Sequence, residues 1–502
     1  MKRQVVIVHF NTPEMTEAAI LSLRRHGGAD YHVTVFDNSD ARPFTKKMEG
    51  VEVMDNTMGQ IVDLDAELRR HPDRSRYMGC SYNGDWNAVT HVFGSARHMI
   101  TVQWFINNFK SDFLLMDSDI LLQQSPDFMF QPDTCVVGHV QTWRKALNPM
   151  QIDRLAPMLL YINAPLCRER GARMYDPARC YALSAGGRST RANWYDTGAA
   201  LLEDIRSHRN GLCGRRIDIR PLMIHYGAGS WHKTSLTAQL DWLDAHRSLW
   251  ADDASVTLGD ATARRPANKS ARIYIASHAD FTPVVSNKVY EVVAPSSDDK
   301  MMGVDGAFFS ELTALHDVAS RKRLPAIVGF CQYRKYYHWM DDVPDLAKLI
   351  KRYGCVVSAN IDLGVSVREH YDRVVGNVAD LDLATTIIES TVPEFAAPWR
   401  VAINQPTLHP ATMFIMSRAD FLEMEASIET IVMGYLSAIG GDIDARIKAN
   451  PARYHLPGST IEYQRRVGGQ LCERIASAWI DWRFPEAREV PIRITGKPQR
   501  RA

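Results

Sequence analysis

The chain has 502 residues, of which 45% are hydrophobic, so it is long enough for two ordinary domains that each bury a core. Its 59 Lys and Arg residues nearly balance its 58 Asp and Glu residues, which gives a net charge of +1. This balance argues against a nucleic-acid-binding protein, which normally carries a basic excess, and against a disordered tail protein.

The cysteines and the hydropathy pattern indicate the cellular compartment in which the protein is expected. The 8 cysteines are scattered without a C-x-x-C pair, which is typical neither of a zinc cluster nor of a disulfide framework. The apolar run at residues 5–8 stops at His9 and is too short for a signal peptide. No stretch approaches the ~18 apolar residues that span a bilayer. We therefore expect a cytoplasmic protein, either free or peripheral to the inner face of a membrane.

The first half alternates patterns of strand and helix. Residues 4–10 have the pattern of a buried strand, residues 14–25 that of a helix, and residues 31–36 that of a second strand. Later, a helix over residues 94–109 leads into a strand at residues 113–116. Strands separated by helices of this length predict a mainly parallel sheet flanked by helices.

A second unit of the same kind follows a change of composition. Residues 251–270 are small, polar and charged, so we expect a linker between one domain at residues 1–250 and another at residues 271–485. The second domain opens with a strand pattern at 272–276 and has a later helix and strand, as the first does. Residues 486–502 are predicted to be a basic tail, either solvated or in contact with anionic lipid headgroups.

Two carboxylates end a predicted strand of the first domain. Asp117 and Asp119 follow residues 113–116 directly, and ligands of open α/β sheets bind at such strand ends. The two side chains can approach one hard cation, which prefers oxygen ligands and would bridge the phosphates of a nucleotide diphosphate. The alternative is a loop with two solvated acids.

The order of motifs in the first 125 residues or so resembles family 2 glycosyltransferases of the GT-A fold. The opening strand ends at His9-Phe10-Asn11, the second strand ends at Asp37, and a Gly-Ser-Ala-Arg stretch ends at Arg97 before the D-x-D sequence at 117–119. His98 stands where the family usually carries asparagine. The resemblance implies a GT-A domain that binds a nucleotide sugar with Mn²⁺ or Mg²⁺.

The family's functional residues map onto specific positions of this chain. Asp37 would contact the uracil or ribose of the donor, and a late histidine would join the metal ligands, with a structural role as the alternative for each histidine. The implied donor-binding residues are Phe10, Asn11, Asp37, Arg97 and Ser118, and the implied metal ligands are Asp117, Asp119, His225 and His232.

Asp196 is our predicted catalytic residue in the first domain. It lies in the segment Asn193-Trp194-Tyr195-Asp196, where aromatic side chains suit stacking on a sugar. We expect it to act as the general base that deprotonates an acceptor hydroxyl. Capping of the helix that continues through residues 199–202 is an equally weighted alternative.

The second domain places cations where the first has carboxylates. Arg334 and Lys335 follow the predicted strand at 326–330. Near 4 Å and at an effective dielectric of about 20, each charge contact with a diphosphate is worth ~4 kcal/mol before desolvation, so fixed cations can take over part of the role of a metal. Fixed cations would allow donor binding without a metal, but on pattern alone we favour the alternative of an exposed basic loop.

Residues 273–482 resemble domain-of-unknown-function family 4422, which occurs in capsule and O-antigen synthesis proteins and is associated with galactofuranosyl transfer. The matching segments lie at 273–278, 310–315, 329–336, 369–371, 413–416 and 466–474. Gln332 replaces the family's usual histidine, and Lys335 replaces an arginine with a point charge. The residues implied in donor binding or catalysis are His278, Asp305, Glu311, Tyr333, Arg334, Lys335, Glu473 and Arg474. Structural pairing with Arg474 or a helix end is the alternative for the two glutamates.

These patterns predict a bifunctional hexosyltransferase with two tandem GT-A-like modules. It would transfer sugars from UDP-linked donors to a glycan or lipid-linked oligosaccharide during synthesis of a bacterial surface polysaccharide: capsule, O-antigen or exopolysaccharide. One alternative keeps the first domain catalytic and makes the second a glycan-binding or scaffolding module, and another is a nucleotide-binding protein without turnover. No G-x-G-x-x-G follows either opening strand and no P-loop is present, which disfavours a dehydrogenase or kinase.

Overall fold

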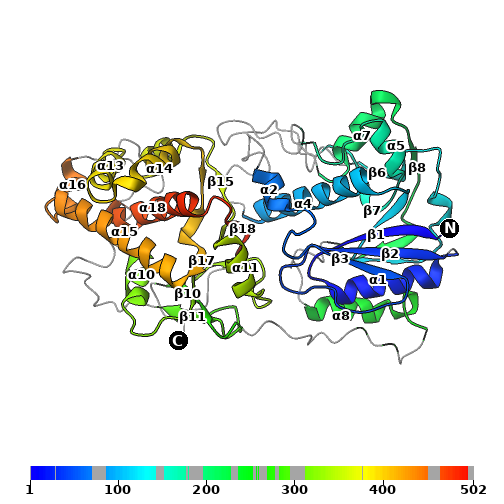
Figure 1. Ribbon diagram of the computed structural model, residues 1–502, viewed down its shortest axis with the longest axis horizontal. Coiled ribbons are helices and arrows are strands. Elements are labelled where there is room, and N and C mark those ends of the chain that lie inside the picture. The colour runs from blue at the N-terminus through cyan, green and yellow to red at the C-terminus, as the bar shows by residue number, and fades with distance from the viewer. Residues whose placement is uncertain are drawn as a thin grey trace.

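The computed structural model shows two lobes, one formed by the first 250 residues and the other by the residues after 270 (Figure 1). It describes residues 2–28, 30–69, 86–142, 152–176, 179, 196–227, 236–252, 256, 258, 268–277, 282–293, 311–375, 377–449 and 464–495. None of the helices in these ranges is both long enough and apolar enough to cross a membrane.

The N-terminal lobe is built on a seven-stranded sheet in the order β3-β2-β1-β4-β7-β6-β8. Every pairing along it is parallel except the two made by β7, so the prediction of a mainly parallel sheet is confirmed for this lobe. The strands are β1 (Arg3–His9), β2 (Tyr31–Asp37), β3 (Val51–Asp55), β4 (Phe113–Asp117), β6 (Val136–Gln141), β7 (Arg154–Ile162) and β8 (Gly214–Arg216).

Helices cover both faces of this sheet because the side chains of its central strand alternate in direction. On one face, Val5 and Ile7 of β1 share a buried cluster with Ile20 of α1. On the other, Val6 packs in a cluster with Phe105 of α4. The described helices of this lobe are α1 (Pro13–His26), α2 (Leu64–Arg69), α4 (Trp86–Asn108), α5 (Ala164–Glu169), α7 (Ala199–Arg206) and α8 (Leu236–Ala245).

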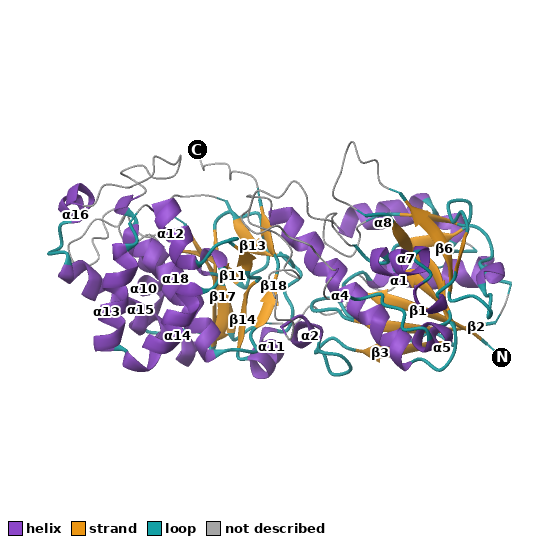
Figure 2. Cartoon of the chain, turned by 90° about the horizontal axis from the view of Figure 1, so that it is seen from above, coloured by secondary structure: helices purple, strands orange, loops and turns teal. Residues whose placement is uncertain are grey.

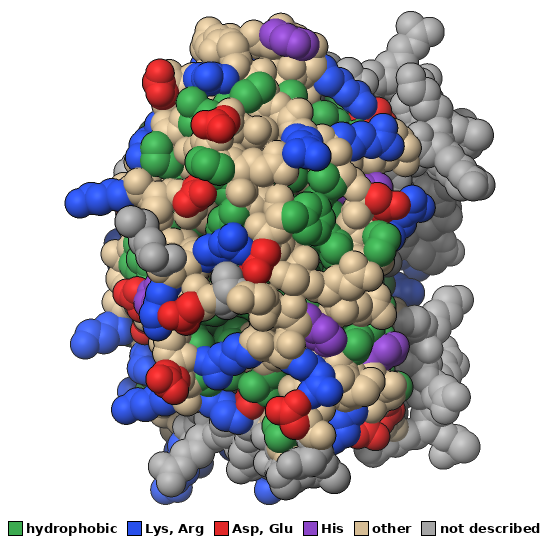
Figure 3. Space-filling model, turned by 90° about the vertical axis from the view of Figure 1, so that its right-hand side faces the viewer, with side chains coloured by type: hydrophobic (Ala, Val, Ile, Leu, Met, Phe, Trp, Pro, Cys, Tyr) green, Lys and Arg blue, Asp and Glu red, His purple; other side chains and the backbone are tan. Residues whose placement is uncertain are grey.

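The outer end of the N-terminal lobe carries charges of both signs. Figure 3 shows acidic and basic side chains interspersed among apolar ones on this face, without one large area of a single sign. This distribution agrees with the near-zero net charge of the whole chain.

The C-terminal lobe has a second sheet, with the main order β11-β10-β12-β17-β14-β18. Here β17 alone runs against its neighbours along this path, as β7 does in the first sheet. In both lobes the reversed strand pairs with the strand that ends in the predicted motif, β4 or β12. The strands are β10 (Ala271–Ala276), β11 (Tyr290–Val293), β12 (Ile327–Gln332), β14 (Cys355–Ser358), β17 (Phe414–Ser417) and β18 (Arg488–Val490).

A group of helices fills the end of this lobe that lies farthest from the N-terminal lobe (Figure 2). Trp399, Tyr435 and Trp479, from three of these helices, are fully buried in one cluster with the inner face of the sheet. The described helices are α10 (Glu311–Ala319), α11 (Leu346–Tyr353), α12 (Val367–Val375), α13 (Ala379–Thr391), α14 (Pro393–Asn404), α15 (Arg418–Ala438), α16 (Ile443–Ala449) and α18 (Val467–Arg483).

The start of the predicted basic tail belongs to the second sheet. β18 pairs with β14, and β19 (Ile492–Ile494) pairs with β13 (Lys335–Tyr337). Val490 and Ile492 are buried in the cluster that faces α11. The segment forms strands because these apolar side chains become buried. The basic composition of the segment concealed them in the sequence.

The predicted linker is also partly packed. Val256 and Leu258 pack against the cluster of the N-terminal lobe that contains Met15 and Leu243, and Asp252 forms an ion pair with Arg25. The first part of the expected linker therefore belongs structurally to the N-terminal lobe.

The two lobes meet at the end of the first sheet where β1 and β2 finish (Figure 1). Nε2 of His338 lies 2.9 Å from Oδ2 of Asp40, and these side chains are only 3% and 2% exposed. The His338 ring also stacks on Phe10 with a centroid separation of 6.1 Å. A second contact joins the Tyr353 hydroxyl to the carbonyl of Met58 at 3.4 Å.

The Asp40–His338 contact leads to a stability prediction. Burial opposes the charged carboxyl of Asp40, but the charge and hydrogen bond of His338 outweigh it and hold the Asp40 pKa well below its usual range. Replacing His338 with alanine removes one of the partners of a buried carboxylate, so we expect a loss of about 3 kcal/mol in the free energy of unfolding, measured by urea denaturation. The double variant Asp40→Asn/His338→Ala should lose less free energy of unfolding than the two single variants lose together. Additive losses would contradict a direct interaction.

Candidate functional site

The carboxyl ends of three adjacent strands bring predicted site residues to one edge of the first sheet. In the register of β1 with its neighbours, His9 lies opposite Asp37 of β2, and Val8 lies opposite Asp117 of β4. Asn11 follows β1 directly. This edge is where open α/β sheets bind their ligands.

A small second sheet brings His225 to the D-x-D turn. β5 (Ile120–Leu122) pairs antiparallel with β9 (Met223–His225), which sets Ile120 opposite His225. The amide of Tyr226 also donates to the carbonyl of Asp119 at 3.0 Å. Two segments far apart in the chain are thus fixed side by side by backbone hydrogen bonds.

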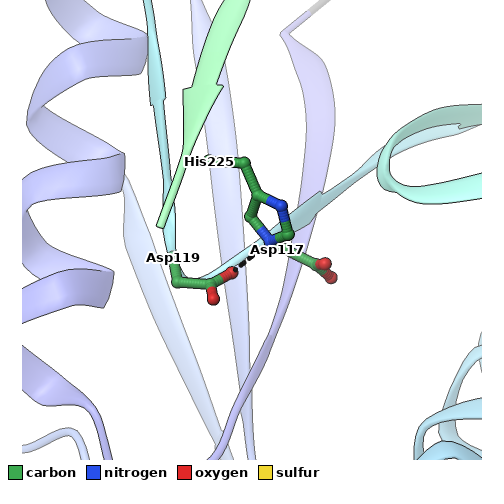
Figure 4. A group of neighbouring side chains, drawn as sticks. All are labelled: Asp117, Asp119 and His225. Carbon is green, nitrogen blue, oxygen red and sulfur yellow. Dashed lines mark ion pairs between the residues drawn. The ribbon is translucent and has the colours of Figure 1, made fainter. Parts of the chain in front are cut away.

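Asp117, Asp119 and His225 lie close enough together for their ligand atoms to reach one metal ion. Each offers one ligand atom, and these atoms all lie within 4.8 Å of one another. Nε2 of His225 is 3.3 Å from Oδ1 of Asp119 (Figure 4). Their side chains are 24%, 7% and 30% exposed, respectively. Two carboxylates and one imidazole suit Mn²⁺ and other first-row divalent ions, and the carboxylates also suit Mg²⁺.

The ionisable side chains of this cluster shift one another's pKa values. Burial raises the pKa of Asp117, and the adjacent charge of Asp119 raises it further, against the opposing effect of His98. Burial opposes protonation of His225, but the hydrogen bond and charge of Asp119 outweigh it and raise its pKa. Burial lowers the pKa of His98, which lies 3.7 Å from Asp117. A divalent cation would offset the repulsion between the two carboxylates.

Asp196 lies near this cluster and is paired with Arg154. Its carboxylate forms an ion pair with Arg154 and accepts a hydrogen bond from the amide of Thr197 at 2.7 Å. The charges of both Asp196 and Arg154 act on His98. The N-cap residue of α7 is Gly198, with a φ of 86°, so the alternative that Asp196 caps this helix is wrong.

The predicted donor-binding residues Asn11 and Asp37 shape the loop that follows β2. Oδ1 of Asn11 accepts hydrogen bonds from the amides of Ala41 and Arg42, each at 2.9 Å. The two carboxylate oxygens of Asp37 accept from the amides of Ser39 and Phe44 at 2.9 and 2.7 Å. These contacts order the loop at the proposed nucleotide edge.

The other predicted donor-binding residues lie on or near the same edge. Ser118 is buried, with its hydroxyl 3.3 Å from that of Thr12. Phe10 is buried against His338 of the other lobe, and Arg97 is buried on α4. His232, His278 and Asp305, three further predicted site residues, lie outside the described residues.

A second polar cluster forms where β12 ends in the C-terminal lobe. Glu311, at the start of α10, accepts a hydrogen bond from Gln332 at 3.1 Å and lies 3.7 Å from the guanidinium of Arg466. Burial lowers the pKa of Lys335, and this effect is opposed by the charges of Glu473 and Glu311. Two carboxylates therefore surround the one lysine that the sequence predicted to bind phosphate.

Glu473 and Arg474 complete this cluster. Glu473 accepts from the amide of Ala411 at 2.7 Å and from the Arg474 guanidinium at 2.7 Å. Burial raises the pKa of Glu473, but Arg474 and Lys335 outweigh it, so its pKa lies below the usual value. Arg474 is 3% exposed and lies over the ring of Tyr371.

Arg334 occupies a different position from Lys335. Gln332 pairs with Lys335 across β12 and β13, so Tyr333 and Arg334 form the turn between the two strands. Arg334 is exposed, and its guanidinium lies 5.1 Å from the Tyr333 ring. The charges of Glu473 and Glu311 act on Lys335, whereas Arg334 lies at the tip of the turn, so the two predicted donor-binding cations have different surroundings.

Sequence reasoning did not identify three residues of these sites: His98 as a neighbour of Asp117, Arg154 and His370. Arg154 lies on β7 without a surrounding motif. His370 belongs to α12, and the charges of Arg474 and Glu473 act on it. The quoted segment at 369–371 contained His370, so family resemblance held a signal for this residue, whereas only the fold brings Arg154 to its site.

Comparison with known proteins identifies part of the C-terminal lobe. Residues 272–483 match the family described as Domain of unknown function (DUF4422), which confirms the resemblance noted for this segment. No family model supports the family 2 resemblance of the N-terminal lobe. The comparison with curated proteins found no match.

Solved structures with partial similarity include three glycosyltransferases. The apo structure of WbbM, a bifunctional glycosyltransferase, has 13% identity and a TM-score of 0.37, and the match covers 46% of each chain. Apo GlyE from Streptococcus pneumoniae has 11% identity and a TM-score of 0.23, covering 56% of this chain and 70% of that one. Mouse xyloside xylosyltransferase 1 has 11% identity and a TM-score of 0.25, and the match covers 53% of this chain and 99% of that one.

His370 gives a pH-dependent prediction. Burial, followed by the charge of Arg474, lowers its pKa from 6.5 to about 4. Between pH 6.5 and pH 4, His370 binds more protons in the unfolded chain than in the folded one. His370 therefore makes the folded protein less stable as the pH falls through this range. In the parent chain, this residue should cost on the order of 3 kcal/mol of the free energy of unfolding at pH 4. We expect His370→Asn to abolish this cost, as measured by urea denaturation between pH 7 and pH 4. Parallel stability curves for the variant and the parent chain would contradict the lowered pKa.

Proposed function

We propose that this chain is a glycosyltransferase that binds a nucleotide-diphosphate sugar at the edge of its first sheet. The observation that carries this proposal is the convergence of Asp117, Asp119 and His225 within 4.8 Å at the carboxyl end of β4. We propose Mn²⁺ or Mg²⁺ as the cation, a UDP-linked sugar as the donor and a glycan or lipid-linked oligosaccharide as the acceptor.

The residues of the chain prepare this site for a diphosphate donor. A bound divalent cation would neutralise charge on the diphosphate leaving group. Asp117 and Asp119 would hold the cation, and the backbone pairing of β5 with β9 fixes His225 beside Asp119. Asn11 and Asp37 order the loop that would border the nucleotide.

Asp196 remains the proposed general base for the acceptor hydroxyl. It is 2% exposed and paired with Arg154, so an incoming hydroxyl has to replace part of this pairing. If Asp196 is the base, Asp196→Asn lowers kcat with little change in donor affinity. If it only holds Arg154, the same variant lowers thermal stability and donor affinity instead.

The second polar cluster supports a second transfer activity, which we propose is galactofuranosyl transfer. Lys335 and Arg466 provide positive charge for a donor phosphate, and Glu311 and Glu473 can accept protons from sugar hydroxyls. The two activities would together extend a bacterial surface polysaccharide at the cytoplasmic side of the membrane. In the alternative function, this cluster binds glycan without catalysis.

Asp119→Asn tests the first activity. The substitution keeps the size of the side chain but removes a charged ligand, so we expect roughly 100-fold slower sugar transfer and weaker Mn²⁺ binding, with unchanged folding. Transfer rate is measured by release of the nucleoside diphosphate, and Mn²⁺ binding by titration calorimetry. Asp30→Asn is the matched control, because Asp30 is an exposed acid that pairs with Lys2 at the opposite end of β2. Full activity of Asp119→Asn in the presence of chelator would refute the proposed site.

Lys335→Ala tests the second activity separately. If both lobes are catalytic, this variant should lose one linkage in the product and Asp119→Asn should lose another. Linkage analysis of the products from both variants gives the answer. Retention of every linkage by Lys335→Ala would favour the glycan-binding alternative for the C-terminal lobe.

A further inference from the structure

A second group of possible metal ligands lies in the C-terminal lobe, on helices rather than at a strand end. His316 belongs to α10, and Glu425 and Glu429 belong to α15. One ligand atom from each of the three residues lies within 4.8 Å of the others. The two glutamates are four residues apart, so they project from the same face of α15 toward α10.

The spacing of the three ligand atoms suits a small divalent ion. Nδ1 of His316 is 3.3 Å from Oε1 of Glu425 and 3.5 Å from Oε1 of Glu429. Zinc binds nitrogen and oxygen ligands at about 2.0–2.2 Å, so two ligand atoms of a tetrahedral zinc site lie ~3.3 Å apart. Both separations from His316 are close to this value, and the two glutamate oxygens lie within 4.8 Å of each other, so the three side chains can approach one zinc-class ion.

The local charge also favours a cation. Glu425 is only 5% exposed. Burial raises its pKa, the negative charge of Glu429 raises it further, and His316 is the neighbour that opposes these effects. With a neutral imidazole, the group carries two carboxylates against no fixed positive charge of its own. A divalent ion would balance both carboxylates and use the imidazole as a neutral ligand.

We propose that His316, Glu425 and Glu429 form a binding site for a divalent transition-metal ion of the zinc class, which fastens α10 to α15. This site is separate from the Asp117 cluster and does not rest on the proposed function. Because α10 begins at Glu311, which accepts a hydrogen bond from Gln332, a bound ion would restrain the helix that carries Glu311 into the second polar cluster.

A competing arrangement has the same coordinates but no metal. A protonated His316 can bridge the two carboxylates through one Nδ1–H, as an ion pair on a helix surface does. The two arrangements differ in one measurable property, because only the metal site has a saturable affinity for Zn²⁺ that requires all three side chains.

The test uses the full chain with Asp119→Asn and His225→Gln, so that the first metal site is disabled. The metal-free protein, kept reduced, is titrated with Zn²⁺ by calorimetry and its thermal unfolding is measured with and without Zn²⁺. We expect His316→Ala and Glu429→Gln, each added to this background, to bind one equivalent less, or to bind it at least 10-fold more weakly, and to lose the Zn²⁺-dependent rise in Tm. Glu429→Gln retains the shape of a side chain that is 30% exposed, so it should fold as the background does.

His32→Ala is the matched control. His32 lies 3.4 Å from Glu52, an exposed histidine–glutamate pair on the N-terminal lobe, and it belongs to no three-ligand group among the described residues. This variant should bind as many equivalents of Zn²⁺ as the background. If His316→Ala and Glu429→Gln titrate like the background and like His32→Ala, the proposal is wrong and the protonated His316 bridge explains the geometry.

Discussion

The parallel pairing of β1 with both β2 and β4 is the constraint on which the N-terminal lobe depends. Because β1 is hydrogen-bonded on both sides, the ends of three strands are held in one register, and His9, Asp37 and Asp117 come to the same edge. The loop after β1 then contacts the loop after β2 through Asn11, which donates to Asp40 at 2.6 Å. Asp40 in turn contacts His338 of the other lobe. The lobe interface and the proposed donor site therefore share one short stretch of backbone.

The two lobes repeat an arrangement of strands but differ in the chemistry at the strand ends. In each sheet a reversed strand pairs with the strand that carries the motif, β7 with β4 and β17 with β12. The first motif presents two carboxylates and a histidine, and the second presents a lysine between glutamates. A common fold fixes where a ligand binds, and the side chains decide which ligand it is and what reaction follows.

The sequence predicted the regular elements well, because their signals are local. The strands near residues 4–10, 31–36 and 113–116 and the mainly parallel first sheet follow from runs of buried side chains and from the intervening helices. The acidic turn at 117–119 was recognised for the same reason. Strands β18 and β19 were assigned to a basic tail, because their arginines concealed the few apolar residues that become buried.

Contacts between distant segments were harder to predict. The sequence offered His225 and His232 as equal metal ligands, and only the antiparallel pairing of β5 with β9 brings His225 beside Asp119. Arg154 lies on β7 and forms an ion pair with Asp196, and no sequence motif predicts this pair. The difference between Arg334 and Lys335 depends on a two-residue turn whose direction is set by the pairing of Gln332 with Lys335.

The packing of Val256 and Leu258 against the N-terminal lobe shortens the covalent tether between the lobes. Between Leu258 and the first strand of the second sheet, about a dozen residues remain, which span ~40 Å at most when fully extended. If the lobe contacts open, each lobe still experiences the other at an effective concentration in the millimolar range that short linkers impose.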